Sequence, residues 1–110
     1  MNLTRGEIVL IEVPFHQAQG AKIRPAVVAL DTGDEDCIVA PITSRARSGE
    51  HEFSITSWQA AGLNTSSNVR IHKVAVIPKA AVKRRIGALT PEDLNAVQVI
   101  LCRVFCAPLA

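Results

Sequence analysis

The sequence predicts a small, mainly β domain that ends in one α-helix. Short runs of β-branched and other apolar residues recur along most of the chain, and Gly, Pro and polar residues separate them. The final apolar positions instead follow the spacing of a helix. With 110 residues, of which 48% are hydrophobic and 20% charged, the chain has the size and composition of one globular core. We therefore expect residues 1–110 to form a single domain.

The first strand is predicted at Glu7–Val13, a run rich in β-branched residues. Residues 14–23 contain Gly20 and several polar side chains and have no clear period, which favours a surface loop that ends at Arg24. Pro25 cannot donate to a strand ladder. It is therefore expected to begin the second strand, at residues 26–30, or to lie at a non-bonded edge position.

The middle of the chain alternates between predicted strands and polar connections. An acidic, Gly-containing turn is expected at residues 31–36, and a basic loop at residues 43–49. The segment 58–63 is ambiguous between one helical turn and a crossover. The strands predicted in this part of the chain are Cys37–Ile42, His51–Ile55, Val69–Ile77 and Val82–Ile86.

The last element is predicted to be an α-helix that begins after Thr90. This residue can cap the helix, Pro91 suits its first position, and Glu92 with Asp93 places negative charge in the first turn. One apolar face follows, formed by Leu94, Val97, Leu101, Val104 and Phe105. A face of this extent favours a homodimer, although the same residues could be packed within one chain.

Composition limits the functional classes. Twelve Lys and Arg against ten Asp and Glu give a net charge of +2, which does not by itself indicate a nucleic-acid partner. Three cysteines without framework spacing favour a reducing compartment. The sequence has no recognisable export signal and no apolar run long enough to cross a membrane. A cytoplasmic, soluble protein without a membrane partner is therefore expected.

Arg24 is the first candidate for chemistry. The following Pro25 biases the Arg24 backbone toward an extended conformation. A guanidinium fixed there could bind a phosphate, or stabilise the charge that develops during phosphoryl transfer. The simpler alternative is a surface arginine that is paired with Glu12 or Asp31.

Hydroxyl and imidazole groups provide further candidates. Thr43 and Ser44 follow an apolar run and could bond a phosphate oxygen, although such residues more often form turns. Arg70 and His72 are two residues apart in a predicted strand, so both are expected on one face. An imidazole beside an arginine suits proton transfer next to a phosphate, whereas a solvated polar face is the alternative. His16 is a second candidate proton carrier.

Metal and nucleotide chemistry have little support in the sequence. The histidines are widely separated, and no phosphate-binding loop of the Walker type occurs. Cys102 and Cys106 could bind zinc only with other ligands, so we expect them to be buried as small apolar residues. No metal or cofactor is expected. A group of basic residues could follow a nucleic-acid backbone or merely protect a sheet edge: Lys79, Lys83, Arg84, Arg85, Arg45 and Arg47.

Several sequence blocks, taken in order, resemble one family. The blocks are RGEIVLIEVPF, GAKIRPAVV, IVAPITS, GLNTSSNVRIHKVAVI and RRIGALTPEDLNAV. Together they resemble the MazF/PemK family of toxin ribonucleases over about residues 5 to 104. The resemblance implies an SH3-like barrel of the CcdB-PemK type with a C-terminal helix. It also implies a homodimer, an antitoxin partner, and cleavage of single-stranded RNA without a metal.

The resemblance also assigns roles to residues. Arg24 and Thr43 match the recurrent catalytic pair, and Arg70 matches a further contributing arginine. The acid expected two residues later is His72 here, and the stretch in which some members carry a carboxylate has Gln17 nearest in register. The general base is therefore left open between His72 and His16. The residues expected to bind RNA are His16, Gln17, Ser44, Arg45 and Arg47.

Two other functions remain as alternatives. The same barrel also carries non-catalytic toxins that bind a protein such as DNA gyrase, and fold alone does not decide between the two activities. A peptide-binding SH3-like module normally needs an aromatic groove. With no Tyr, one Trp and three Phe, this chain is poorly suited to that role.

Overall fold

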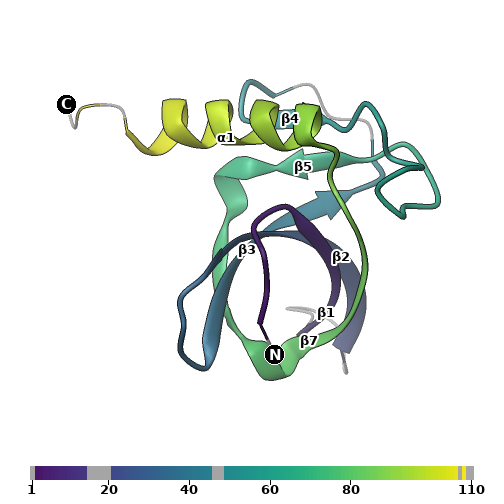
Figure 1. Ribbon diagram of the computed structural model, residues 1–110, viewed down its shortest axis with the longest axis vertical. Coiled ribbons are helices and arrows are strands. Elements are labelled where there is room, and N and C mark those ends of the chain that lie inside the picture. The colour runs from purple at the N-terminus through teal and green to yellow at the C-terminus, as the bar shows by residue number, and fades with distance from the viewer. Residues whose placement is uncertain (1, 15–20, 46–48, 107, 109–110) are drawn as a thin grey trace.

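The computed structural model describes residues 2–14, 21–45, 49–106 and 108. These residues form seven strands, two short 3-10 helices and one α-helix (Figure 1). The strands are β1 (Glu7–Pro14), β2 (Ala21–Asp31), β3 (Asp36–Thr43), β4 (Glu52–Ser54), β5 (Asn68–Arg70), β6 (Ala75–Pro78) and β7 (Val82–Ala88). The helices are η1 (Ile71–Lys73), η2 (Lys79–Ala81) and α1 (Pro91–Phe105).

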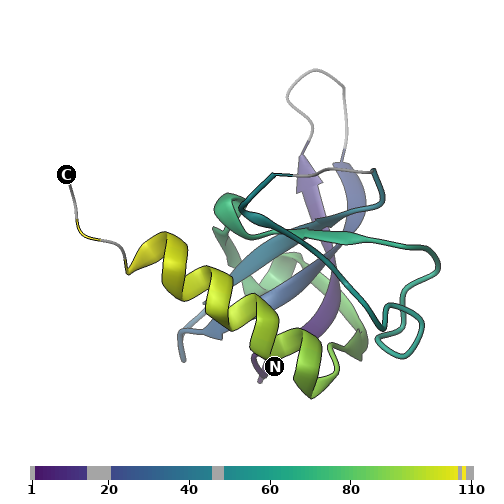
Figure 2. The ribbon, with the colours of Figure 1, turned by 90° about the horizontal axis from the view of Figure 1, so that it is seen from above.

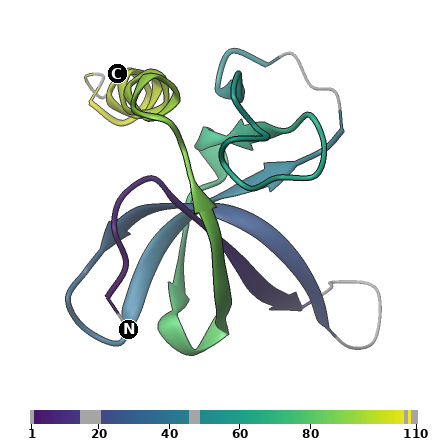
Figure 3. The same ribbon diagram turned by 45° about the vertical axis from the view of Figure 1, so that its right-hand side comes forward.

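All strand pairs are antiparallel. The order in the sheet is β4-β5-β3-β2-β1-β7, and β6 pairs with a second stretch of β3. The predicted mainly β fold with a C-terminal helix is therefore confirmed. β4 and β7 lie at the two ends of this order, and no ladder between described residues pairs them with each other. The sheet is therefore strongly curved but open. Figure 2 and Figure 3 show α1 and the β4–β5 pair on the same side of this curved sheet.

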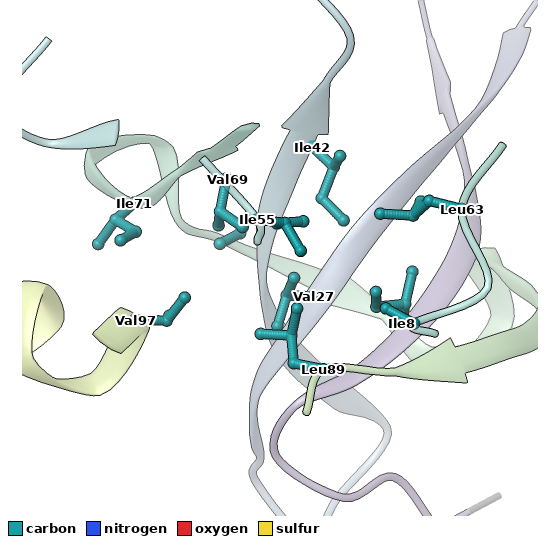
Figure 4. Packing of buried hydrophobic residues seen from close by; sticks show 11 residues of the cluster. Ile8, Val27, Ile42, Ile55, Leu63, Val69, Ile71, Leu89 and Val97 are labelled. Carbon is teal, nitrogen blue, oxygen red and sulfur yellow. The ribbon is translucent and has the colours of Figure 1, made fainter. Parts of the chain in front are cut away.

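The core consists of two clusters on opposite faces of the central strands. In β2, Ala26 and Val28 belong to one cluster, and Val27 belongs to the other. Successive side chains of a strand point to opposite faces, so β2 is buried on both sides and its sequence there is continuously apolar. The cluster that contains Val27 fills the space between the sheet, α1 and the segment around Ile55 (Figure 4).

The second strand begins earlier than predicted. β1 and β2 remain paired as far as Pro14 and Ala21, so the hairpin ladder includes residues that the sequence predicts to form a loop. Arg24 consequently lies inside β2 and not at its start. Pro25 comes one residue before the β2–β3 ladder begins at Ala26, which is compatible with its missing N–H.

The prediction of one strand over residues 69–77 is wrong. β5 pairs with Ile42 and Thr43 at the end of β3, whereas β6 pairs with residues 36–39 at its beginning. The chain must cross between these two positions, and η1 makes the crossing with Ile71 buried beneath it. Arg70 and His72 therefore do not share a strand face.

The α-helix begins as predicted. The Thr90 hydroxyl accepts a hydrogen bond from the Asp93 amide at 3.3 Å. Asp93 is 3% exposed, and its carboxylate accepts hydrogen bonds from the amides of Thr56 at 3.3 Å and Ser57 at 2.9 Å. The segment after Ser57 forms a helical turn, which was one of the two alternatives. The helix start is thus tied to this turn.

The expectation that Cys102 and Cys106 are buried is wrong. Both are exposed, with their sulfur atoms 3.5 Å apart, because α1 buries the opposite face around Val97. The described residues contain no group of three or more potential metal-ligating side chains. Among them, no helix has the length and apolar character needed to cross a membrane.

Candidate functional site

A positively charged groove lies where β2, β3 and β5 meet. Its volume is about 610 Å³, and its lining includes five cationic side chains and no acidic one. A groove of this composition suits a ligand that carries several negative charges. The lining residues are Lys22, Arg24, Pro41, Ile42, Thr43, Ser44, Arg45, Arg70 and Lys73.

Strand register places the predicted pair Arg24 and Thr43 together. The β2–β3 ladder pairs Ala26 with Pro41, and continuing the same register by two residues sets Arg24 opposite Thr43. Thr43 also pairs with Asn68 of β5, and Arg70 follows two residues later. Because side chains two apart share a face, Arg24, Thr43, Asn68 and Arg70 face the same side.

Asn68 shapes the turn that follows β3. This residue is 8% exposed, and its Nδ2 donates to the Arg45 carbonyl at 3.1 Å. The Ser54 hydroxyl donates to Asn68 Oδ1 at 2.7 Å, which fixes the amide between two elements. Thr43 Oγ1 accepts from the Arg45 amide at 3.2 Å, so its own O–H can still donate to a ligand. Sequence reasoning missed Asn68, because its role depends on the pairing with Thr43.

Arg70 is held by a carboxylate that sequence reasoning also missed. Glu52 of β4 lies directly opposite Arg70 in the β4–β5 register. Its Oε1 accepts a hydrogen bond from Arg70 Nε at 2.9 Å. The Glu52 side chain is 6% exposed, whereas that of Arg70 is 26% exposed. The pair therefore extends from the interior to the groove.

The remaining candidates differ in their positions. Ser44 and Arg45 line the groove, as do Lys22 and Lys73, which sequence reasoning had not selected. His72 lies in η1 and does not contribute to the lining; its ring centre is 5.7 Å from that of His51, and its Nδ1 is buried without a hydrogen-bond partner in the described structure. Three predicted RNA-binding residues lie outside the described residues: His16, Gln17 and Arg47.

A second depression of about 270 Å³ adjoins the groove. Arg24, Ile42 and Ser44 line both spaces. The rest of the second space combines aliphatic side chains with the polar groups of the turn after Leu63, namely Leu10, Pro25, Gly62, Leu63, Asn64, Thr65, Ser67 and Ile86. It could receive a flat, largely apolar group that is joined to an anion in the groove.

Most of the later basic run serves the sheet and not the groove. Lys79 pairs with Asp31 at 2.7 Å, Lys83 with Glu12 at 2.8 Å, and Arg85 with Glu7 at 2.9 Å. These pairs support the alternative of a charged sheet edge.

Fold and site together define a class of protein. It is a small antiparallel β domain with a C-terminal helix and a cationic groove suited to a ligand that contains phosphates. The chain belongs to the family of PemK-like, MazF-like toxins of type II toxin-antitoxin systems, whose family model matches residues 4–105. A comparison with curated proteins found no match to the sequence.

Solved structures share this fold. The Mycobacterium tuberculosis toxin MazF-mt6 has 22% identity and a TM-score of 0.76, with 94% of this chain and 99% of that chain covered. An endoribonuclease in complex with its cognate antitoxin, from Mycobacterial species, has 15% identity and a TM-score of 0.76, with coverages of 99% and 100%. MazE-MazF (Form-III) from Deinococcus radiodurans has 17% identity and a TM-score of 0.76, with coverages of 96% and 98%.

Proposed function

We propose that the chain is the toxin of a type II toxin-antitoxin system and acts as an endoribonuclease on single-stranded RNA without a metal ion. The observation that carries the proposal is the cationic groove lined by Arg24, Thr43 and Arg70. Membership of the toxin family supports the same activity.

The groove residues suit RNA transesterification. A base removes the proton of a ribose 2′-hydroxyl, the oxygen attacks the adjacent phosphorus, and the bond to the 5′-oxygen breaks. That leaving oxygen takes up a proton. The products are a 2′,3′-cyclic phosphate and a free 5′-hydroxyl. The need for a 2′-hydroxyl distinguishes RNA from DNA.

Each groove residue has a separate role in this reaction. Arg24 and Thr43 stabilise the negative charge that grows on the phosphorane oxygens, and Arg70 orients the phosphate. Ser44 and Arg45 bind the RNA backbone nearby. The adjoining depression receives a base of the same strand, because its mixture of aliphatic and polar lining residues suits a planar heterocycle. The base that removes the proton remains a hypothesis, with His72 and His16 as the two candidates.

The proposal includes two protein partners. Structures with the same fold include those of an endoribonuclease in complex with its cognate antitoxin and of MazE-MazF. By analogy, we propose that this chain forms a homodimer and binds a cognate antitoxin. Val99 and Phe105 of α1 are exposed apolar residues and could contribute to such a contact.

A cleavage assay in the presence of EDTA tests the function. Purified protein is incubated with a single-stranded RNA and with its all-DNA counterpart, and the product ends are analysed. We expect the RNA alone to be cut, and the products to carry cyclic phosphate and 5′-hydroxyl ends. An intact RNA, or cleavage of both substrates, would contradict the proposal. Binding of DNA gyrase by a chain that cuts no RNA would instead support the alternative function.

A further inference from the structure

A buried carboxylate lies behind the wall of the groove. Glu52 is contributed by β4, which supplies no residue to the groove lining. One of its oxygens bonds Arg70, and the other, Oε2, is buried without a hydrogen-bond partner in the described part of the chain. A carboxylate in this position is costly, because burial removes water from a charged group that has more than one bond to satisfy.

The stability of the folded chain does not by itself explain why Glu52 is buried as a charged partner of Arg70. A buried ion pair is often no more stabilising than two well-packed apolar residues of similar volume. Val69 and Phe53, the next pair of the same ladder, point to the opposite face and pack in the apolar core, whereas Arg70 and Glu52 lie on the other face, where Arg70 lines the groove. The retained charge of Glu52 therefore requires an explanation in what Arg70 does.

Arg70 connects the buried carboxylate to the groove. Glu52 engages the Nε–H, which is one of five guanidinium donors, so the terminal nitrogens can meet an anion in the groove. Arg45 and Lys73 also line the groove, and neither has a carboxylate partner among the described residues. Exposed cations of that kind can follow a polymer backbone, whereas a guanidinium held from behind suits one fixed phosphate.

We propose that Glu52 is a positioning residue, which aims the Arg70 guanidinium at the phosphate that reacts. This inference rests on the proposed ribonuclease function. A cation that is already oriented does not have to reorganise when charge develops on the phosphorane, so its benefit is largest in the transition state. Loss of Glu52 also removes a negative charge beside Arg70. This loss does not weaken the attraction of the groove for RNA in the ground state.

The test compares Glu52→Gln, Glu52→Asp and Asp31→Asn with the wild-type chain. Gln keeps the size of the side chain but removes its charge, and Asp keeps the charge on a shorter side chain. Asp31→Asn is the matched control, because it breaks a partly buried ion pair with Lys79 that lies outside the groove. For each protein, kcat and KM are measured with one RNA substrate in EDTA, and unfolding by denaturant is measured in parallel.

We expect Glu52→Gln to lower kcat about tenfold or more while KM stays within about threefold of wild type. Glu52→Asp should recover part of kcat. Asp31→Asn should lower stability and leave both kinetic constants unchanged wherever it is folded. A folded Glu52→Gln with wild-type kcat, or a loss of kcat in Asp31→Asn as large as in Glu52→Gln, would overturn the positioning role. If the wild-type chain cuts no RNA, the proposed function itself fails, and the inference fails with it.

Discussion

Asp31 joins three parts of the chain through one carboxylate. Its oxygens accept hydrogen bonds from the amides of Leu3 at 3.0 Å and Gly33 at 2.8 Å, and Lys79 Nζ lies 2.7 Å away. The hydrogen bond from Lys79 and those from the two amides hold the pKa of Asp31 well below its ordinary value of 3.8. The charged carboxylate therefore stabilises the folded state.

The lowered pKa predicts how stability depends on pH. Because the folded pKa is depressed, the unfolded chain takes up the proton first as the pH falls. The stabilisation by Asp31 is complete above its ordinary pKa and is lost as the pH falls below 3.8 toward the folded value. We expect Asp31→Asn to be less stable than wild type at neutral pH, and the difference to shrink in acid. Unfolding curves measured across this range test it; a difference that stays constant with pH would contradict it.

The residues of the site differ in how far the sequence could predict them. Arg24, Thr43 and Arg70 were predicted because they lie in recognisable blocks, and each of them lines the groove. Glu52 and Asn68 were not predicted, because each acts through a cross-strand partner that is 14 or more residues away in the chain. Their importance depends on register, which local patterns do not encode.

At the scale of elements, the turn after Ser57 is held against β7 by close backbone contact. A Cβ on Gly87 would lie 1.9 Å from the Ala61 carbonyl oxygen, and a Cβ on Gly62 would lie 2.2 Å from that of Ile86. No side chain fits between these backbones. The contact positions Gly62 and Leu63, which line the depression beside Arg24.

Gly87→Ala should therefore be strongly destabilising. The added methyl group must push two backbones apart, and we expect a loss of about 3 kcal/mol or more in the free energy of unfolding. Gly49→Ala is the matched control, since its Cβ would meet nothing closer than 3.8 Å. Denaturant titration of both variants measures the effect. Equal stability of Gly87→Ala and wild type would contradict the close packing.

The buried Asp93 carboxylate should also make a large contribution to the free energy of unfolding. Asp93→Ala leaves the amides of Thr56 and Ser57 without their acceptor, so we expect a loss of about 2 kcal/mol or more. Glu92→Ala, in the exposed neighbouring position, should change the free energy of unfolding by no more than about 0.5 kcal/mol. Thermal or denaturant unfolding compares the two. A smaller loss for Asp93→Ala than for Glu92→Ala would contradict this role.

Elements that depend on local signals were predicted best. The start of α1 follows from Thr90, Pro91 and two acids, all within one turn, and the structure confirms it. The interruption of residues 69–77 was missed, because it arises from the two places at which β3 is paired. Because of this interruption, His72 lies in η1 and does not share a strand face with Arg70. The predicted strand therefore no longer supports His72 as the general base.

At the scale of the whole molecule, the groove exists because residues from three different strands meet in the fold. β2 brings Arg24, β3 brings Thr43 and β5 brings Arg70, while the net charge of the chain is only +2. Three of the other cations, Lys79, Lys83 and Arg85, are paired with Asp31, Glu12 and Glu7. Composition alone therefore could not predict a polyanion site, whereas the distribution of charge in the fold indicates one.

Single-turnover cleavage of RNA in EDTA by Arg24→Ala tests the central claim most directly. Arg24 lines both the groove and the adjoining depression, so its loss should slow cleavage about a hundredfold or more while unfolding remains close to wild type. Arg103→Ala, which removes an exposed arginine from α1, is the control and should cut at the wild-type rate. A folded Arg24→Ala that cleaves RNA as fast as wild type and Arg103→Ala would contradict the assignment of this groove as the active site.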